Sequence, residues 1–155
     1  MALKFEEITD KNFHDCIALE VHPEQKDCFY FKSNRPNVMS LAEAYIYKDH
    51  KVLAVYDDET MVGTVFYSPK NDFGGAWLTR LMIDNRHQGK GFGRRTMEML
   101  VERIQEETHG ECARLGTSYE PKNSIAEKLY KSLGFRPSGE NLGDQIIVWL
   151  DLKIA

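Results

Sequence analysis

The sequence predicts an α/β fold in which a mixed sheet of six or seven strands is flanked by about four helices. Apolar residues alternate or cluster in short runs typical of strands, and these runs are separated by segments with helical spacing. The order is β-α-α-β-β-β-α-β-α-β. Residues 77–118 read as strand, helix, strand, a passage that requires a right-handed parallel crossover. The hairpin that precedes this passage is antiparallel, so the sheet must be mixed.

The N-terminal third predicts one strand and two helices around an irregular segment. Residues 3–8 alternate and predict the strand, and apolar residues then recur at helical spacing: Phe13, Cys16, Ile17 and Val21. Residues 21–39 contain two prolines and are predicted to be irregular, a kind of segment that often lines substrate sites. Ser40 and Glu43 have the spacing of a capping box and predict the start of the second helix.

The middle of the chain predicts a hairpin. Residues 52–56 and 61–67 are rich in strand-forming side chains and are joined by the polar turn 57–60. Residues 68–75 are polar and are predicted to form a loop.

The C-terminal half alternates strands with helices. Residues 77–83, 112–118 and 145–152 are predicted strands, with further short strands near Arg136. A long amphipathic helix begins after Gly91 and turns four apolar residues to the core: Met97, Leu100, Val101 and Ile104. Ser124 and Glu127 form a second capping box. The helix it opens ends at Gly134 and has one apolar face: Ile125, Ala126, Leu129, Tyr130 and Leu133.

Length and composition predict one globular domain, residues 1–155, with 42% hydrophobic and 28% charged residues. The net charge of −4 provides no general attraction for nucleic acid. We find no apolar run long enough for a membrane span and no signal-peptide pattern, so we expect a cytoplasmic protein without membrane partners. Three unpaired cysteines and five scattered histidines predict no disulfide framework and no metal site, and each cysteine is expected to be a small buried hydrophobe.

The most informative motif is the glycine-rich turn Gln88-Gly89-Lys90-Gly91-Phe92-Gly93, between a predicted strand and a predicted helix. At such a turn, backbone N–H groups converge and the helix dipole is positive, a geometry that binds anions. Alternate glycines allow positive φ values and a close approach of phosphate. The spacing fits neither the dinucleotide fingerprint, which needs glycine at position 94, nor the P-loop.

The charges at the start of this helix support an anion site. Lys90, Arg94 and Arg95 lie where the helix dipole disfavours cations by about 0.3–1 kcal/mol each. Residues 86–96 include no Asp or Glu. This inverted pattern indicates that a multiply charged anion binds over the turn.

Residues Gln88, Gly91 and Gly93 match motif A of the GCN5-related N-acetyltransferase (GNAT) superfamily, which the chain resembles along essentially its whole length. A second signature of that superfamily is matched by Asn123, Ala126, Leu129-Tyr130 and Gly134-Phe135. The resemblance implies that two strands, residues 77–83 and 112–118, part to form a V that holds acetyl-coenzyme A. The implied cofactor-binding residues are Leu81, Met82, Ile83, Gln88, Gly89, Lys90, Gly91, Phe92, Gly93, Arg94, Asn123 and Ala126.

The resemblance also implies catalytic roles. Tyr130 resembles the tyrosine that protonates the coenzyme A sulfur, and a backbone N–H near residues 81–83 would polarise the thioester carbonyl. Many relatives have a glutamate on the central strand as the base, whereas residues 77–83 contain no carboxylate. The base is therefore open among Glu24, Tyr67, Glu120 and a chain of waters.

Several short stretches resemble bacterial spermine/spermidine acetyltransferases: Pro23-Glu24-Gln25 with Phe29, Ser40-Leu41-Ala42-Glu43, Trp77-Leu78 with Arg80, Ile83-Asp84 and Tyr119-Glu120. This resemblance suggests a polyamine acceptor bound by Glu24, Phe29, Trp77 and Glu120. Glu43 and Asp58 are further candidates for holding distal ammonium groups. A protein N-terminus, an antibiotic amine and an amino acid are alternative acceptors. Two other functions are less well supported. A noncatalytic coenzyme A binder would not need Tyr130, which this chain has. A nucleic-acid-binding module would need a continuous basic face, whereas the net charge here is −4. The oligomeric state is open, with a homodimer among the alternatives.

Overall fold

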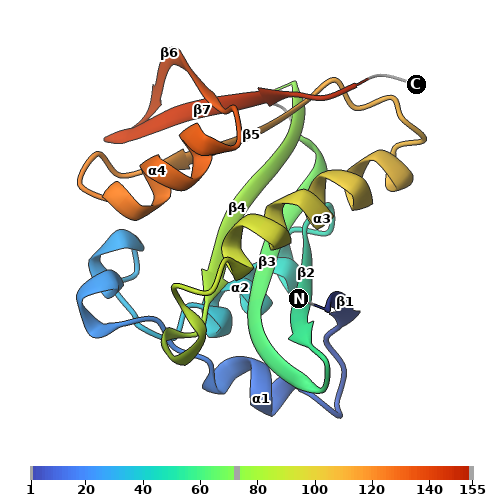
Figure 1. The fold of residues 1–155 in the computed structure, drawn as a ribbon, viewed down its shortest axis with the longest axis vertical. Helices are drawn as coiled ribbons and strands as arrows, with labels where there is room; N and C mark the ends of the chain where they lie inside the picture. The colour runs from blue at the N-terminus through green and yellow to red at the C-terminus, as the bar shows by residue number, and fades with distance from the viewer. Residues whose placement is uncertain (1, 72–73, 154–155) are drawn as a thin grey trace.

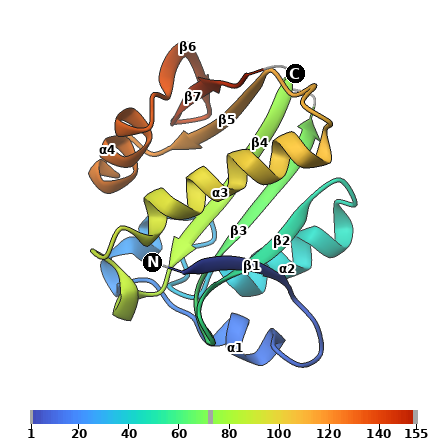
Figure 2. The same ribbon diagram turned by 45° about the vertical axis from the view of Figure 1, so that its right-hand side comes forward.

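The protein, seen in a computed structural model that describes residues 2–71 and 74–153, is built on one seven-stranded sheet. The strand order is β1-β2-β3-β4-β5-β7-β6, and every neighbouring pair is antiparallel except β4 with β5. Helices α3 and α4 cover one face of the sheet, and α1 and α2 lie against the other (Figure 1, Figure 2). The predicted mixed sheet with its parallel pair is therefore confirmed.

The strands are β1 (Leu3–Glu7), β2 (Lys51–Asp57), β3 (Thr60–Asn71), β4 (Gly75–Ile83), β5 (Arg114–Tyr119), β6 (Arg136–Leu142) and β7 (Gln145–Asp151). The α-helices are α1 (Phe13–Ala18), α2 (Asn37–Ile46), α3 (Phe92–Glu107) and α4 (Ser124–Ser132), and the 3₁₀ helices are η1 (Pro23–Cys28) and η2 (Asn85–His87). Within the described ranges, no helix is long and apolar enough to cross a membrane.

Both predicted capping boxes are wrong. Helix α2 begins at Asn37 after Pro36, and Ser40 and Glu43 lie inside it, where both accept hydrogen bonds from Arg80 of β4. At α4 the cap is Asn123, one residue before the predicted one, and its side chain accepts a hydrogen bond from the Ala126 N–H at 3.2 Å. Asparagine is among the best N-cap residues, because its short side chain reaches the free N–H groups of the first turn.

The predicted loop at residues 68–75 is also wrong in part, because β3 continues to Asn71 and β4 begins at Gly75; residues 72 and 73 lie outside the described ranges. Ser68 is fully buried and its hydroxyl donates to the Lys70 carbonyl at 2.7 Å. This local hydrogen bond satisfies a polar side chain that would otherwise favour a loop.

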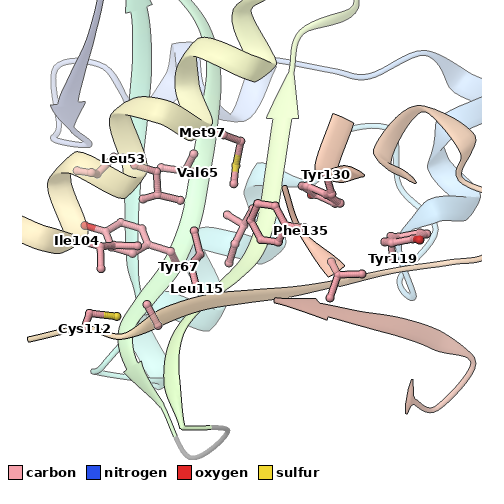
Figure 3. Packing of buried hydrophobic residues seen from close by; sticks show 14 residues of the cluster. Leu53, Val65, Tyr67, Met97, Ile104, Cys112, Leu115, Tyr119, Tyr130 and Phe135 are labelled. Atoms are coloured by element: carbon pink, nitrogen blue, oxygen red, sulfur yellow. The ribbon is translucent and has the colours of Figure 1, made fainter. Parts of the chain in front are cut away.

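The main core lies between the sheet and helices α3 and α4. Met97, Leu100 and Ile104 of α3 are almost completely buried, as their helical spacing predicted. They pack on strand residues that include Val65 and Leu115, while Tyr130 and Phe135 extend the same cluster beneath α4 (Figure 3). Fixing α3 against the sheet fixes the glycine turn at its N-terminus.

Strands β4 and β5 pair for three residues and then part. Their register runs from Ala76↔Leu115 to Leu78↔Thr117, although β4 continues to Ile83. The pairing with β3 shifts at the same place, because Phe66 pairs with Arg80 and Tyr67 with Leu78, which leaves Thr79 as a bulge. Bulges bend a strand and end regular pairing. The predicted V between the two strands is confirmed, with its apex at Leu78.

Gly116 lets two indole rings meet beside this apex. The rings of Trp77 and Trp149 are 5.7 Å apart in an edge-to-face arrangement. A Cβ on Gly116 would lie 2.6 Å from Trp149 and 2.7 Å from Trp77. Glycine is therefore required here by space.

We expect Gly116→Ala to destabilise the protein by about 1–3 kcal/mol through overpacking, which lowers the Tm by several degrees for a chain of this size. Gly93→Ala in α3 is the matched control, since the added Cβ would lie 3.6 Å from the Leu129 side chain of α4, an ordinary van der Waals contact. Thermal denaturation followed by circular dichroism compares the two. An unchanged Tm for Gly116→Ala would contradict the packing described here.

Candidate active site

The parted strands enclose a cavity of about 730 Å³. Its walls come from η1 and the residues that follow it, from β4 and the turn after it, and from the end of β5 and helix α4. Elements far apart in the sequence therefore meet at the V.

The glycine turn forms one end of the cavity. Gly91 is the N-cap of α3 and adopts φ +82°, and Gly89 adopts φ +78° with nothing within 4 Å of where a Cβ would lie. Both values fall in the left-handed region that favours glycine. The first turn of α3 has no acidic residue, and Arg94 lines the cavity. A phosphate group fits this turn, because its N–H groups, its dipole and its nearby cation all favour an anion.

Most of the predicted cofactor-binding residues line this cavity: Leu81, Met82, Ile83, Gln88, Gly89, Gly91, Phe92, Gly93, Arg94, Asn123 and Ala126. Lys90 is exposed and does not belong to the lining. Beyond Leu78, β4 remains paired with β3 but has left β5, so one edge of its backbone faces the V. Such an edge can bind an extended chain that carries amide groups.

Tyr130 belongs to α4 and its buried side chain lies beside the apex of the V, with its ring 6.0 Å from that of Tyr119 (Figure 3). Burial raises the pKa of Tyr130 to about 12, and a hydrogen bond with Thr117 partly offsets this rise. The Thr117 hydroxyl donates its one proton to the carbonyl of Leu78 at 2.8 Å, and Leu78 is the last residue of β4 that pairs with β5. The Tyr130 phenol therefore stays protonated near neutral pH and can donate a proton into the cavity.

Three of the four predicted substrate-binding residues line the cavity, namely Phe29, Trp77 and Glu120. Glu120 lies 3.6 Å from Lys122, whose side chain is exposed, so this ion pair is weak. Glu24 is exposed on η1 and is not part of the lining. Asp58 lies in the β2–β3 turn at φ +54°, also outside the lining.

Tyr67 does not reach the cavity, so its nomination as a base is wrong. Its side chain is fully buried in the core under α3, and its hydroxyl donates to Glu107 at 2.7 Å. Burial and this carboxylate raise the pKa of Tyr67. The phenol is thus committed to the core.

A polar cluster lies on the α2 side of the cavity, and Glu43, a predicted candidate for holding a distal ammonium, is part of the lining. Oε1 of Glu43 accepts hydrogen bonds from the Tyr30 hydroxyl at 2.7 Å and from Arg80 at 2.8 Å. Arg80 also lies against the rings of Tyr30, Phe31 and Phe66. Oε2 of Glu43 has no hydrogen-bond partner in the described part of the chain. The sequence points to Glu43 but does not predict its contacts with Tyr30 and Arg80, which come from other parts of the chain.

Two further expectations need correction. Cys16 and Cys112 are buried as predicted, whereas Cys28 is partly exposed and lines the cavity, because η1 carries it to the mouth of the V. Ile125 was placed on the apolar face of α4, yet it is 64% exposed and also lines the cavity.

Comparison with known proteins agrees with this geometry. Residues 18–135 match the model of the "Acetyltransferase (GNAT) family". The chain is 29% identical over 146 residues to the spermine/spermidine N(1)-acetyltransferase of Bacillus subtilis, covering 90% of this chain and 91% of that protein.

Solved structures share the fold. An acetyltransferase from Thermus thermophilus superposes with a TM-score of 0.75 at 19% identity, covering 98% of both chains. The spermidine N-acetyltransferase from Vibrio cholerae, determined in complex with CoA and spermine, gives 0.72 at 15% identity and covers 98% of this chain and 95% of its own. The open V of the sheet is lined by the glycine turn and by a buried tyrosine. Because the family model also matches residues 18–135, this chain belongs to the GNAT acetyltransferase family.

Proposed function

We propose that the protein transfers the acetyl group of acetyl-coenzyme A to a primary amine, and that the preferred amine is a polyamine such as spermidine or spermine. The observation that carries the proposal is the V itself, with an anion-binding turn at one end and Tyr130 at its apex. Acetyl-coenzyme A would supply an activated thioester at this place. The rest of the chemistry falls to residues of this chain.

The glycine turn would hold the pyrophosphate through the N–H groups at the start of α3. The free edge of β4 at residues 81–83 would pair with the amides of the pantetheine arm, and one of its N–H groups would polarise the thioester carbonyl. Tyr130 would donate its proton to the departing thiolate, since this residue lines the cavity and its phenol stays protonated.

The acceptor amine attacks directly in a ternary complex. The alternative, an acyl-enzyme on Cys28, is disfavoured because burial and the nearby Glu120 raise the pKa of this thiol. The nucleophile in such chemistry is the thiolate, which a raised pKa makes scarcer. An ammonium group must lose its proton before attack, and Glu120 is the one predicted base candidate that lines the cavity. We assign Glu120 to accept this proton, directly or through water.

A polyamine fits the acceptor end for two reasons. Phe29, Tyr30 and Trp77 offer aromatic surface to methylene groups and cations. Arg80 cancels most of the charge of Glu43, but Oε2 of Glu43 can accept a hydrogen bond from a distal ammonium. The relatives named as spermine/spermidine and spermidine acetyltransferases support this acceptor class.

We expect kcat/KM for spermidine or spermine to exceed that for butylamine by about tenfold or more, because butylamine lacks the second ammonium. An exposed ion pair gives only about 0–1 kcal/mol, so a preference of this size must come from a partly buried contact and should survive at high salt. The rate at which the coenzyme A thiol is released measures turnover of all three amines at low and high salt.

Glu43→Gln is a matched variant that keeps an acceptor oxygen for Tyr30 and Arg80 but replaces Oε2 with an amide NH2 group, which cannot accept a hydrogen bond from an ammonium. It should reduce the preference for spermidine over butylamine while leaving butylamine nearly unchanged. Equal kcat/KM for butylamine and spermidine in the wild type, at both salt concentrations, would contradict the polyamine assignment and leave acetyl transfer intact.

A further inference from the structure

The connection between α1 and α2, residues 19–36, forms a closed loop that we call the strap. Its two ends are tied together, because the Val21 N–H donates to the Asn34 carbonyl at 2.8 Å and the Asn34 amide donates to Glu20 at 3.0 Å. Helix η1 lies within it and carries Gln25 and Cys28 to the cavity. The position of this part of the acceptor site therefore depends on what holds the strap.

The base of the strap is fixed to the end of β4. The Glu20 N–H donates to Oδ2 of Asp84 at 3.0 Å, and the Asn85 N–H donates to the Glu20 carbonyl at 2.8 Å. Asp84 is almost completely buried, and its other oxygen accepts two hydrogen bonds from Arg86. Burial alone would raise the pKa of Asp84, but these hydrogen bonds outweigh it and lower the pKa. The carboxylate stays charged and holds both segments.

A second tie joins η1 to the glycine turn itself. The side-chain amide nitrogen of Gln88 donates to the Ile83 carbonyl at 2.9 Å and to Oε1 of Gln25 at 3.0 Å. Oε1 of Gln25 also accepts from the His22 N–H at 3.0 Å. An amide nitrogen has two N–H groups, so both donors of Gln88 are used within the protein. The side chain at this motif position thus connects the turn to the strap.

We propose that Gln88 is a positioning residue that couples the two halves of the active site through Gln25. Coenzyme A bound at the turn restrains Gln88, and Gln88 in turn restrains η1. When η1 is already ordered, less conformational entropy is lost as the acceptor binds. By linkage, the acceptor must then strengthen coenzyme binding by the same factor. Couplings of this kind are typically about 5- to 150-fold. The proposal rests on the proposed function in placing coenzyme A at the glycine turn.

Gln25 offers a clean test, because it takes part in the tie only as an acceptor. Gln25→Glu keeps a carboxyl oxygen for both Gln88 and His22, whereas Gln25→Leu has a similar size and accepts neither hydrogen bond. Amide hydrogen exchange is measured on the wild type and both variants, with and without saturating coenzyme A. This readout requires no turnover and no knowledge of the acceptor.

In the wild type and in Gln25→Glu, coenzyme A should slow exchange both in the turn and in the strap, with the strap slowed by about fivefold or more. In Gln25→Leu the turn should be protected as before, while the strap is slowed less than about twofold. If Gln25→Leu keeps the full slowing in the strap, or if the wild-type strap does not respond, the coupling is overturned. If coenzyme A protects no amide of the turn, the proposed function fails as well.

Kinetics provide a second readout that a merely structural role would not produce. The coupling predicts that Gln25→Leu raises KM for the amine by about fivefold or more and changes kcat at saturating substrates by less than about threefold, whereas Gln25→Glu, which keeps the tie, should not raise this KM. An equal fall in kcat for both variants would indicate general damage to the site and would overturn the positioning role.

Discussion

Replacing Gly91 with valine is expected to abolish measurable binding of acetyl-coenzyme A in a protein that still folds. Gly91 adopts φ +82° as the N-cap of α3, where a β-branched residue costs of order 1–3 kcal/mol and will rotate the backbone to escape strain. That rotation turns N–H groups away from the anion, and the valine side chain occupies the space a phosphate would need. Isothermal titration calorimetry with acetyl-coenzyme A measures the loss.

Gly139→Val separates backbone strain from loss of the site. Gly139 has a similar φ of +86° in β6, and a Cβ there would meet nothing within 4 Å. Both variants should lose similar stability in thermal denaturation, but the Gly139 variant should bind acetyl-coenzyme A like the wild type. A folded Gly91→Val protein with wild-type affinity would mean that the anion binds elsewhere.

Replacing Tyr130 with phenylalanine is expected to lower turnover by roughly 10²- to 10⁴-fold, the contribution typical of a positioned general acid. The change removes one hydroxyl from a ring that is 8% exposed, so coenzyme affinity and stability should change little. Because the pKa of Tyr130 is raised to about 12, its ionisation should cause no loss of activity as the pH rises to about 10. Steady-state kinetics across this range measure both effects.

Tyr119→Phe is the control, since Tyr119 also lines the cavity and its ring neighbours that of Tyr130. Its turnover should remain within a few-fold of the wild type. If Tyr130→Phe also stays within threefold, water or another group protonates the thiolate.

The order of strands and helices could be predicted because it follows from local spacing of apolar residues. The start of α2 could not be predicted in this way. Ser40 and Glu43 fit a local capping pattern but instead accept hydrogen bonds from Arg80, which lies about 40 residues further along the chain. The residues of β3 near Ser68 were predicted as a loop because they are polar. The hydrogen bond that lets Ser68 be buried in a strand cannot be predicted from composition.

The cofactor end of the site was easier to predict than the acceptor end. Gln88, Gly91 and Gly93 lie within one turn, so their closeness in space follows from their closeness in the sequence. The acceptor end combines Tyr30, Glu43 and Arg80 from three separate elements, and only the folded chain brings them together. For the same reason the sequence favours Glu24, which has the right chemistry but lies outside the lining.

The contact between Trp77 and Trp149 that Gly116 permits also gives the protein an intrinsic optical signal. The chain has two tryptophans, and both belong to the edge-to-face pair beside the apex of the V. All indole fluorescence, and any exciton coupling between the two chromophores in circular dichroism, therefore arises at one place. Trp77 lines the cavity, so a ligand that enters the V will perturb this signal without any attached label.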